Sequence, residues 1–323
     1  MRGRPDHSQV SQTDAAPGRR VAVLMTVHNG ARFLEEQIES LVRQSVEPID
    51  LWVSDDGSED KTAEIIARTV GEWTKGEARC LHGPGRGFAE NYRALMTMPE
   101  VDANYVAFCD QDDHWDDDKL ATAIAWLETQ PEGHPALYCS RTRIVSEDGS
   151  TIGVSQLFPR QPSFRNALVQ SIAGGNTMVM NRAAHAVIRE ASKRATFVSH
   201  DWWCYQIVTG VGGTVHYSPE PKIGYRQHDN NAIGENITWR ARMARVRSIT
   251  QGRFREWNER NLAGLLACRD VLTPEAQELV DAFQTARGRG LFTRIAALRR
   301  AKLYRQTPIG QIALYTACIL RKL

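Results

Sequence analysis

Apolar stretches and helical stretches alternate between residues 21 and 130, and this rhythm restricts the fold more than any other feature of the chain. VAVLMTV, residues 21–27, is an apolar, β-branched run that ends in His28-Asn29-Gly30, and a segment with apolar residues at helical spacing follows it. The same unit recurs three times, with strands expected at 49–54, in ARCLH and in NYVAFCD. Four alternating units predict an α/β fold with a mostly parallel sheet and helices on both faces.

The rhythm changes after Pro135. ALYCSRTRIVSEDGSTIG is typical of two strands around a turn at 147–150, and short segments rich in Gly and Pro follow. The second half of the main domain is therefore expected to be mixed strand and loop. From Trp239 onward the chain is rich in Arg and helical in pattern. We expect a disordered leader at 1–19, a main domain at 20–238 and a basic helical region at 239–323.

The charge of the chain is divided between these regions. Residues 1–239 hold 23 Lys and Arg against 32 Asp and Glu, whereas residues 240–323 hold 17 against 6. A basic amphipathic helix can lie on an anionic membrane surface, and an oligomer interface or a helix folded back on the domain would explain the pattern equally well. Nucleic acid is not expected as a partner, because regular aromatic interleaving is missing from the basic stretch.

The cysteines and the apolar runs bear on location. The six cysteines form no CxxC pair, which favours reduced thiols in a cytosol. Residues 1–19 have no apolar core of a signal peptide, and the apolar run at 312–320 is far shorter than the roughly 20 residues that span a bilayer. We expect a cytoplasmic protein, with the inner face of the cell membrane as a peripheral location.

Two acidic clusters follow expected strands. Asp55-Asp56 comes after the second strand, and Asp110-Gln111-Asp112-Asp113 comes after the fourth. Ligands of open α/β sheets bind beyond the carboxyl ends of the strands, and carboxylates that meet there repel each other unless a cation lies among them. The spacing of Asp110 and Asp112 is suited to Mg²⁺ or Mn²⁺ with positions left for phosphate oxygens. For 116–118 we expect only a solvated helix start, where the helix dipole favours Asp.

Two other readings of nearby motifs fail. An EF-hand counted from Asp110 would need Gly and Glu where Trp115 and Ala121 stand. GPGRGFAEN, residues 83–91, lacks the Lys-Ser/Thr of a P-loop and the dinucleotide fingerprint, so neither an ATPase nor a dehydrogenase is supported. Its glycines serve a turn, with Arg86 and Asn91 as candidates for contact with a donor.

Six segments taken in order resemble one family. MTVHNGARFLEEQIESLVRQS, VSDDGSEDKT, FCDQDDHW, GNTMVMNR, SHDWW and GYRQHDNN are similar to the family 2 inverting glycosyltransferases of the GT-A fold, and within them to bacterial rhamnosyltransferase-like members. The resemblance covers about two thirds of the chain. It implies a GT-A mixed sheet, with the basic helical region as an extension.

The resemblance assigns roles to residues of this chain. Asp56, with Asp55 beside it, would contact the nucleoside, and the strand end with Thr26, His28 and Asn29 would wall its pocket. Asp110 and Asp112 would hold the metal that bridges the donor diphosphate. Inversion needs a base on the opposite face of the sugar, and Asp201 matches that position. The alternative for Asp201 is an ordinary Asp in the first turn of a helix after a Ser199 cap.

Later motifs add candidates. His228 would complete the metal site and Arg226 would neutralise phosphate, although an exposed loop His is an equally good interpretation of His228. Gly174, Gly175 and Asn176 resemble the acceptor-side segment of the family. Trp202 and Trp203 would either stack on a sugar or be buried, and His200 is expected to be structural.

Together these features predict a metal-dependent inverting glycosyltransferase. The expected donor is dTDP-rhamnose, with a UDP-hexose as the alternative, and the expected acceptor is a saccharide or a lipid-linked saccharide of a bacterial surface polysaccharide. A nucleotidyltransferase is a rival, but MTVHNGARFLEE lacks its basic glycine-rich signature. A non-catalytic nucleotide-sugar-binding protein is a further alternative, and a homo-oligomer is compatible with the pattern.

Overall fold

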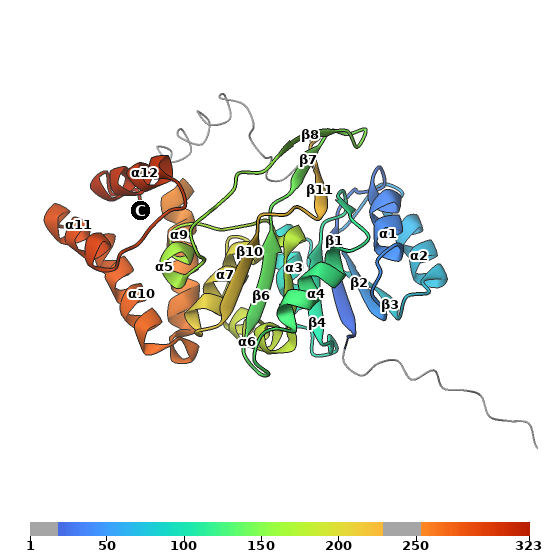
Figure 1. Ribbon diagram of the computed structural model, residues 1–323, viewed down its shortest axis with the longest axis horizontal. Helices are drawn as coiled ribbons and strands as arrows, with labels where there is room; N and C mark the ends of the chain where they lie inside the picture. Colours follow the sequence, from blue (N-terminus) through green and yellow to red (C-terminus); the bar gives the residue numbers. More distant parts are fainter. Residues whose placement is uncertain (1–18, 229–252) are drawn as a thin grey trace, which may run out of the picture.

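The structure, a computed structural model, describes residues 19–228 and 253–323 and centres on a seven-stranded sheet (Figure 1). The strand order is β10-β6-β9-β4-β1-β2-β3. The four strands predicted from the alternating units are parallel neighbours: β1 (Val21–Val27), β2 (Ile49–Asp55), β3 (Ala78–His82) and β4 (Tyr105–Cys109). The predicted α/β class with a mostly parallel sheet is confirmed.

Helices cover both faces of this sheet. All seven residues of β1 are buried, and successive side chains point to opposite faces, with Leu24 in one core and Val23 in the other. The Val23 face packs against α1 (Leu34–Val42), α2 (Thr62–Glu72) and α4 (Lys119–Leu127). The Leu24 face packs against α3 (Phe88–Thr97), α6 (Arg182–Arg194) and α7 (His200–Gly210).

The second half of the domain differs from the expectation. The first of the two strands expected after Pro135 is in fact two, because β6 (Ala136–Ser140) belongs to the large sheet and β7 (Arg143–Val145) to a four-stranded sheet of order β5-β11-β7-β8. The expected turn at 147–150 does join β7 to an antiparallel β8 (Thr151–Val154). The other members of the small sheet are β5 (His114–Trp115) and β11 (Ile223–Arg226).

Helices and further strands also occupy a part that was expected to be strand and loop. The long α6 and α7 lie there, with the short α5 (Phe164–Ala167) before them. The pattern of α6 was missed because its buried stripe consists mainly of small or polar side chains: Ala184, His185, Ile188, Ala191 and Ser192. Two further strands complete the large sheet, β10 (Thr214–Ser218), parallel to β6, and β9 (Val179–Asn181), antiparallel to both β4 and β6.

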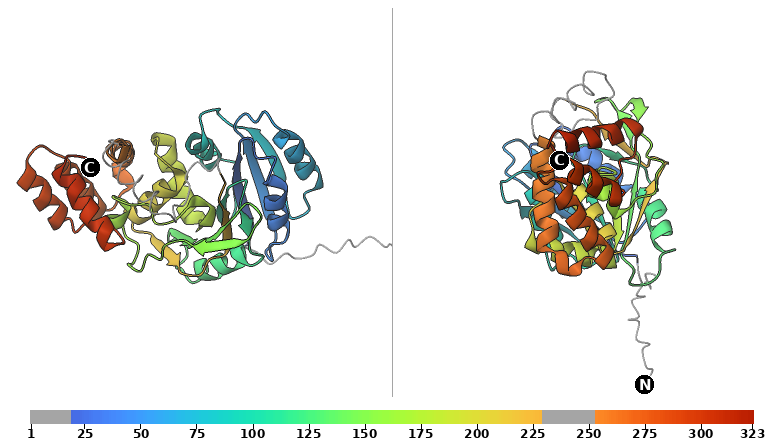
Figure 2. Two further views of the ribbon diagram at one scale, coloured as in Figure 1. Left: turned by 90° about the horizontal axis from the view of Figure 1, so that it is seen from above. Right: turned by 90° about the vertical axis from the view of Figure 1, so that its left-hand side faces the viewer.

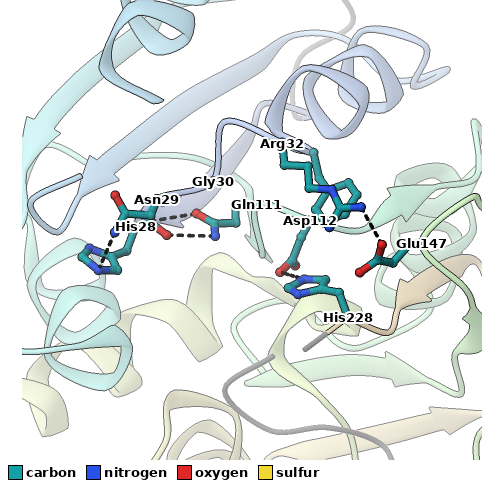
Figure 3. Close-up of a pocket in the computed structure, with 9 residues that line it drawn as sticks. His28, Asn29, Gly30, Arg32, Gln111, Asp112, Glu147 and His228 are labelled. Carbon is teal, nitrogen blue, oxygen red and sulfur yellow. Dashed lines mark hydrogen bonds and ion pairs between the residues drawn. The ribbon is translucent and has the colours of Figure 1, made fainter. Parts of the chain in front are cut away.

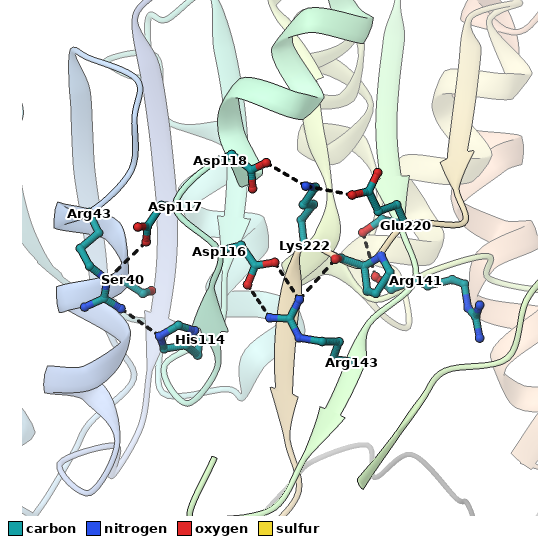
Figure 4. A network of polar contacts seen from close by, with 12 residues as sticks. Ser40, Arg43, His114, Asp116, Asp117, Asp118, Arg141, Arg143, Glu220 and Lys222 are labelled. Carbon is teal, nitrogen blue, oxygen red and sulfur yellow. Dashed lines mark hydrogen bonds and ion pairs between the residues drawn. The ribbon is translucent and has the colours of Figure 1, made fainter. Parts of the chain in front are cut away.

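Ion pairs join the start of α4 to the small sheet (Figure 4). Asp116 pairs with Arg143 of β7, and Asp118 pairs with Lys222 at 2.8 Å, directly before β11. Asp117 lies 3.3 Å from Arg43. The aspartates at 116–118 thus precede the helix as expected, but they are paired with cations and are not simply solvated.

The C-terminal region is helical, as expected, and four helices of it are described: α9 (Arg253–Ala267), α10 (Pro274–Ala286), α11 (Leu291–Arg300) and α12 (Pro308–Ile319). Figure 2 shows them grouped at one end of the molecule. Leu262 and Leu265 of α9 belong to the same apolar core as Trp203 of α7. The expected domain boundary at 238–239 lies outside the described residues. Within those residues, no helix combines the length and the apolar character that crossing a membrane requires.

Gly264 allows α9 to approach α7, and this contact can be tested. A Cβ atom at Gly264 would lie 2.9 Å from the buried Trp203 ring, which cannot rotate away cheaply. Gly to Ala in a helix ordinarily stabilises by about 0.5–1 kcal/mol. We expect Gly264→Ala to lower the free energy of unfolding in urea, whereas Gly71→Ala in α2, where a Cβ meets nothing within 4 Å, should raise it. Equal gains from both variants would contradict the close packing of α9 on α7.

Candidate active site

Loops that follow β1, β4, β7 and β11 meet at one edge of the molecule and enclose a pocket of about 530 Å³ (Figure 3). This is the edge at which ligands of open α/β sheets bind, because the carboxyl ends of the parallel strands point to it. The pocket is lined by His28, Asn29, Gly30, Arg32, Phe33, Gln111, Asp112, Glu147 and His228.

The loop after β1 is fixed by hydrogen bonds to its backbone. Gln111 accepts from the His28 N–H (2.8 Å) and donates to the His28 carbonyl (3.1 Å). The Asn29 N–H donates to Ser58 Oγ at 2.9 Å, and Asn29 adopts a positive φ of 49°, which Asn tolerates better than most residues. A Cβ on Gly30 would lie 2.4 Å from Gln111 Oε1, so a side chain there would displace the Gln111 amide from the His28 backbone. The pocket wall is therefore preorganised.

Asp55 and Asp56 both hold loops through their side chains. Asp55 Oδ1 accepts hydrogen bonds from the N–H and the hydroxyl of Ser58, at 2.9 and 2.6 Å. The Asp56 carboxylate accepts from the N–H groups of Gly85 and Gly87, each at 2.7 Å. Asp56 thus fixes the glycine-rich loop between β3 and α3, a function that the sequence did not suggest.

Arg86 is at the tip of that loop. Its side chain is exposed, and no ion pair to it is found within 19–228 or 253–323. Asn91, the other candidate of this motif, is 1% exposed, and its amide bonds with the Ser54 carbonyl and hydroxyl. Arg86 therefore stays a candidate for contact with a donor, whereas the Asn91 side chain serves to attach α3 to β2.

Asp110 stands at the end of β4. Its Oδ1 lies 2.9 Å from the hydroxyl of the buried Tyr92, which also bonds the Cys109 carbonyl and contacts the Thr26 side chain. Desolvation raises the pKa of Asp110 to about 7, and the charges of Asp112 and Asp201 contribute to this increase. Thr26 is 9% exposed, so it lies beneath the pocket.

Asp112 and His228 meet at the pocket wall. The distance from His228 Nε2 to Asp112 Oδ2 is 2.9 Å, and the His228 ring stacks on Phe33 with 5.2 Å between the ring centroids. The two residues come from loops 116 positions apart in the chain. His228 is therefore not an isolated loop histidine, because its ring is held against the second carboxylate of the acidic motif.

Asp113 and Arg226 form the floor of this region. Asp113 is fully buried, accepts from Asn176 Nδ2 at 2.5 Å and from the Arg226 N–H at 3.3 Å, and burial raises its pKa well above the usual range. Arg226 is 2% exposed, and its guanidinium binds the carbonyls of Asp112 and Glu147 and lies 2.7 Å from Glu36. These contacts engage the Arg226 side chain within the protein, where the sequence had suggested a phosphate ligand.

Asp201 lies in the first turn of α7. Its Oδ2 accepts a hydrogen bond from Ser171 Oγ at 3.3 Å, whereas its buried Oδ1 has no hydrogen-bond partner in the described part of the chain. Desolvation raises the pKa of Asp201. A carboxylate oxygen without a partner and with increased basicity has the properties of a proton acceptor.

The residues around Asp201 are buried in the protein core, in line with the expectation that Trp202 and Trp203 are buried and that His200 is structural. Trp202 and Trp203 are buried and donate to the Ala167 carbonyl and to Ser192 Oγ. His200 is buried as well and stacks on Tyr92 with 3.7 Å between the centroids. A Cβ on Gly175 would come within 1.8 Å of His200 Nε2, so Gly175 provides space for this ring.

The structure thus separates the predicted residues into three groups. His28, Asn29, Asp112 and His228 line the pocket. A second group lies beside or beneath the lining: Thr26, Asp55, Asp56, Asp110 and Arg226. Asp201 and Arg86 are not part of the lining, although the charge of Asp201 acts on Asp110. Five lining residues were not predicted from the sequence: Gly30, Arg32, Phe33, Gln111 and Glu147. Of these, Arg32 and Glu147 form a 2.5 Å ion pair.

The acidic motif has the chemistry of a site for a hard cation, although its side chains do not supply a complete set of ligands. Among the residues that the structure describes, no three His, Cys, Asp or Glu side chains gather closely enough to hold an ion by themselves. Asp110, Asp112 and Asp113 nevertheless crowd at one strand end, and burial, followed by repulsion from the neighbouring carboxylates, raises the pKa values of Asp110 and Asp113. Mg²⁺ typically takes one or two carboxylates and fills its other positions with water and phosphate. The residues present therefore fit such an ion.

Comparisons with known proteins find related sequences and a related fold. The sequence model of "Glycosyl transferase family 2" matches residues 22–194. The "dTDP-rhamnosyl transferase RfbG" of Shigella flexneri is 24% identical over 244 residues, which cover 72% of this chain and 81% of that protein. The structure of S. aureus TarS 1–349 in complex with UDP-GlcNAc superimposes with a TM-score of 0.52 at 15% identity, covering 93% of this chain and 90% of that chain. The overall fold is that of the GT-A glycosyltransferases.

The clamp between Asp56 and the glycine-rich loop gives a measurable expectation. An Asn side chain has one carbonyl oxygen, so Asp56→Asn retains only one of the two acceptors for the Gly85 and Gly87 N–H groups. We expect faster hydrogen–deuterium exchange at 83–87, by about tenfold if one hydrogen bond of about 1.4 kcal/mol is lost. Asp148→Asn, in the exposed turn between β7 and β8, is the control and should leave that exchange unchanged. Unaltered exchange in Asp56→Asn would contradict the clamp.

Proposed function

Because the chain belongs to glycosyl transferase family 2, we propose that it transfers a sugar with inversion from a nucleotide diphosphate donor to an acceptor hydroxyl, with a divalent metal. The observation that carries this proposal is that carboxylates from two separate parts of the chain lie at one edge of the sheet. Asp110 and Asp112 come from the end of β4, and Asp201 comes from α7 with an oxygen that no described residue engages.

Asp110, Asp112 and His228 would hold Mg²⁺ or Mn²⁺. When bound, the ion would stabilise the negative charge that grows on the departing diphosphate without requiring a proton. Asp110 and Asp112 would contribute negative charge at the end of β4, and His228 would contribute its ring nitrogen Nε2, which lies next to Asp112 Oδ2. Phe33 holds the His228 ring in this orientation by stacking.

The nucleoside would lie against the loop after β1. Its wall would consist of His28 and Asn29, with Thr26 beneath them and Asp55 fixing Ser58 behind them. Asp56 would act by fixing the glycine-rich loop, which presents Arg86 as a cation for the donor phosphates. Arg226 would support the site from below, through the Asp112 and Glu147 carbonyls.

Asp201 would remove the proton of the acceptor hydroxyl. Attack on the anomeric carbon from the face opposite the leaving diphosphate forms the new glycosidic bond, breaks the bond to the diphosphate, and leaves the proton on Asp201. Burial raises the pKa of Asp201, which strengthens it as a base. The hydrogen bond from Ser171 fixes one oxygen and leaves the other for the acceptor.

We propose dTDP-rhamnose as the donor and a saccharide or lipid-linked saccharide of a bacterial surface polysaccharide as the acceptor. Support for the donor comes from the Shigella flexneri relative, which is named a dTDP-rhamnosyl transferase and is 24% identical to this chain. A UDP-hexose is the alternative donor. All six cysteines are free thiols, five of them buried, which fits a reaction in the reducing cytoplasm.

The proposed base can be tested by separating turnover from donor binding. Asp201→Asn keeps the size of the side chain and its acceptor for Ser171, but it cannot take a proton at neutral pH. We expect the turnover rate to fall by about 10²- to 10⁴-fold, with an unchanged Kd for the donor. Asp117→Asn, which affects only the surface pair with Arg43, is the matched control. Near-normal turnover in Asp201→Asn would remove Asp201 from the mechanism.

The donor and the metal can be tested together by thermal shift and donor hydrolysis. The panel contains dTDP-rhamnose, UDP-glucose, UDP-galactose and GDP-mannose, each with Mg²⁺, with Mn²⁺ and with EDTA. We expect dTDP-rhamnose to raise the Tm only with metal, because the ion would bind the donor diphosphate. A ligand at a hundredfold excess over its Kd adds about 2.7 kcal/mol to the free energy of unfolding. Asp112→Asn should lose this effect, and Asp118→Asn, in a surface pair with Lys222, should keep it.

The outcomes of the panel are distinct. A UDP-sugar that is the sole donor to stabilise the protein would replace rhamnose in the proposal. A stabilising donor that works equally well in EDTA would contradict the metal. Binding of a nucleotide in wild type and in Asp201→Asn without turnover of any donor would favour a non-catalytic protein.

A further inference from the structure

Helix α12 presents a stripe of large aliphatic side chains to the outside. Ile309, Ile312, Ile319 and Leu320 are 81%, 67%, 49% and 56% exposed. Their spacing along the chain places them on one face of the helix, and its opposite face is buried through Leu314, Ala317 and Cys318. Contiguous exposed apolar surface of this kind commonly marks a site that binds a protein or a membrane.

This stripe belongs to a firmly packed part of the molecule. Buried Arg294 of α11 donates to the Cys318 and Ile319 carbonyls at 2.9 and 3.0 Å and so closes the last turn of α12. Thr307 caps its first turn by accepting from the Gly310 N–H. The exposure of the stripe is therefore a property of an ordered helix and not of a loose chain end. Phe292, 86% exposed, adds an aromatic ring on the adjacent α11.

The charged residues of the segment that carries the stripe are all of one sign. Residues 282–323 contain nine Lys and Arg and neither Asp nor Glu. Arg299, Arg300, Lys302 and Arg321 are exposed, and no ion pair to them is found in the described part of the chain. Cations of the main domain are by contrast commonly paired, as in the contacts of Arg143 with Asp116 and of Lys222 with Asp118.

We propose that α11 and α12 form a docking surface for an anionic lipid bilayer. The aliphatic stripe would enter the boundary between headgroups and acyl chains, while the flanking cations would bind the anionic headgroups. At 1.5 Å per residue the helix is about 18 Å long, which suits a position in the plane of the interface and not a span. A second copy of the chain is a poorer occupant, because two surfaces that each carry the exposed Arg299, Arg300, Lys302 and Arg321 would repel one another.

The position of this surface suits an acceptor held by a membrane. Figure 1 places α12 toward the same edge of the molecule as β7, β8 and β11, whose loops contribute Glu147 and His228 to the pocket. An acceptor anchored in the bilayer would then be presented on the pocket side. Only this last step rests on the proposed function, because the docking surface itself requires neither a donor nor turnover.

Vesicle co-sedimentation of the full chain tests the proposal. The vesicles are made of phosphatidylcholine alone or of equal parts phosphatidylcholine and phosphatidylglycerol, at low and high salt. We expect binding to the anionic vesicles only, weakened by salt. The double variant Ile309→Ser with Ile312→Ser should lower the affinity by about tenfold or more, and so should Arg299→Gln with Arg300→Gln, since each cation near such a surface adds about 1 kcal/mol.

Matched variants at the far end of the molecule are the controls. Val42→Ser removes an exposed apolar side chain from α1, and Arg68→Gln with Arg79→Gln removes two charges, so both should bind like the wild type. Absence of binding to anionic vesicles would overturn the proposal, as would equal binding to both kinds of vesicle. Concentration-dependent dimerisation that the Ile309→Ser and Ile312→Ser variant abolishes, without any vesicle binding, would assign the stripe to a second copy. Failure of vesicle binding would leave turnover in solution unaffected, so the two proposals fail separately.

Discussion

The arrangement of the pocket depends on the contacts of the buried Arg226 guanidinium. It joins three segments that are distant in the sequence, by binding the Asp112 carbonyl after β4, the Glu147 carbonyl after β7 and the Glu36 carboxylate of α1. Its planar fork of donors is suited to several acceptors at once, which a Lys would not satisfy. Because Arg226 ends β11 of the small sheet and Glu36 belongs to α1, which packs on the large sheet, this one side chain ties the small sheet to a helix of the large one. The neighbouring His228 is thereby brought to Asp112.

Local patterns in the sequence predicted the half of the fold that is built from consecutive β/α units. There each strand is buried on both faces, so an unbroken apolar run such as residues 21–27 marks it unambiguously. The second half is governed by contacts between distant segments. The backbone of 136–145 leaves one sheet and enters another, and α6 packs through Ala and Ser side chains, so neither follows from local periodicity. Antiparallel β9 inserts between β4 and β6, and this pairing depends on tertiary contacts and not on a local sequence pattern.

The candidate site shows the same division. The acidic motif was found from sequence because carboxylates at a strand end are chemically conspicuous, and the structure places Asp112 in the pocket. The sequence could not show that Asp56 is engaged by two glycine N–H groups or that Arg226 is buried, because both depend on what the rest of the fold brings near them. Gln111, between the two aspartates of the motif, was passed over, although its side chain fixes the loop after β1.

The environment of Asp201 illustrates how packing can set the chemistry of one carboxylate. Its neighbour His200 is buried against Tyr92, and desolvation lowers the pKa of His200 to about 3. The ring is therefore neutral throughout the range in which enzymes usually work, and it does not offer Asp201 a positive charge that would lower its basicity. Desolvation then raises the pKa of Asp201, against the opposing effect of hydrogen bonds from Ser199, Trp202 and Ser171. Gly175 is what makes this arrangement possible, since any side chain there would displace the ring. A glycine on a separate loop thus helps to keep the proposed base strong.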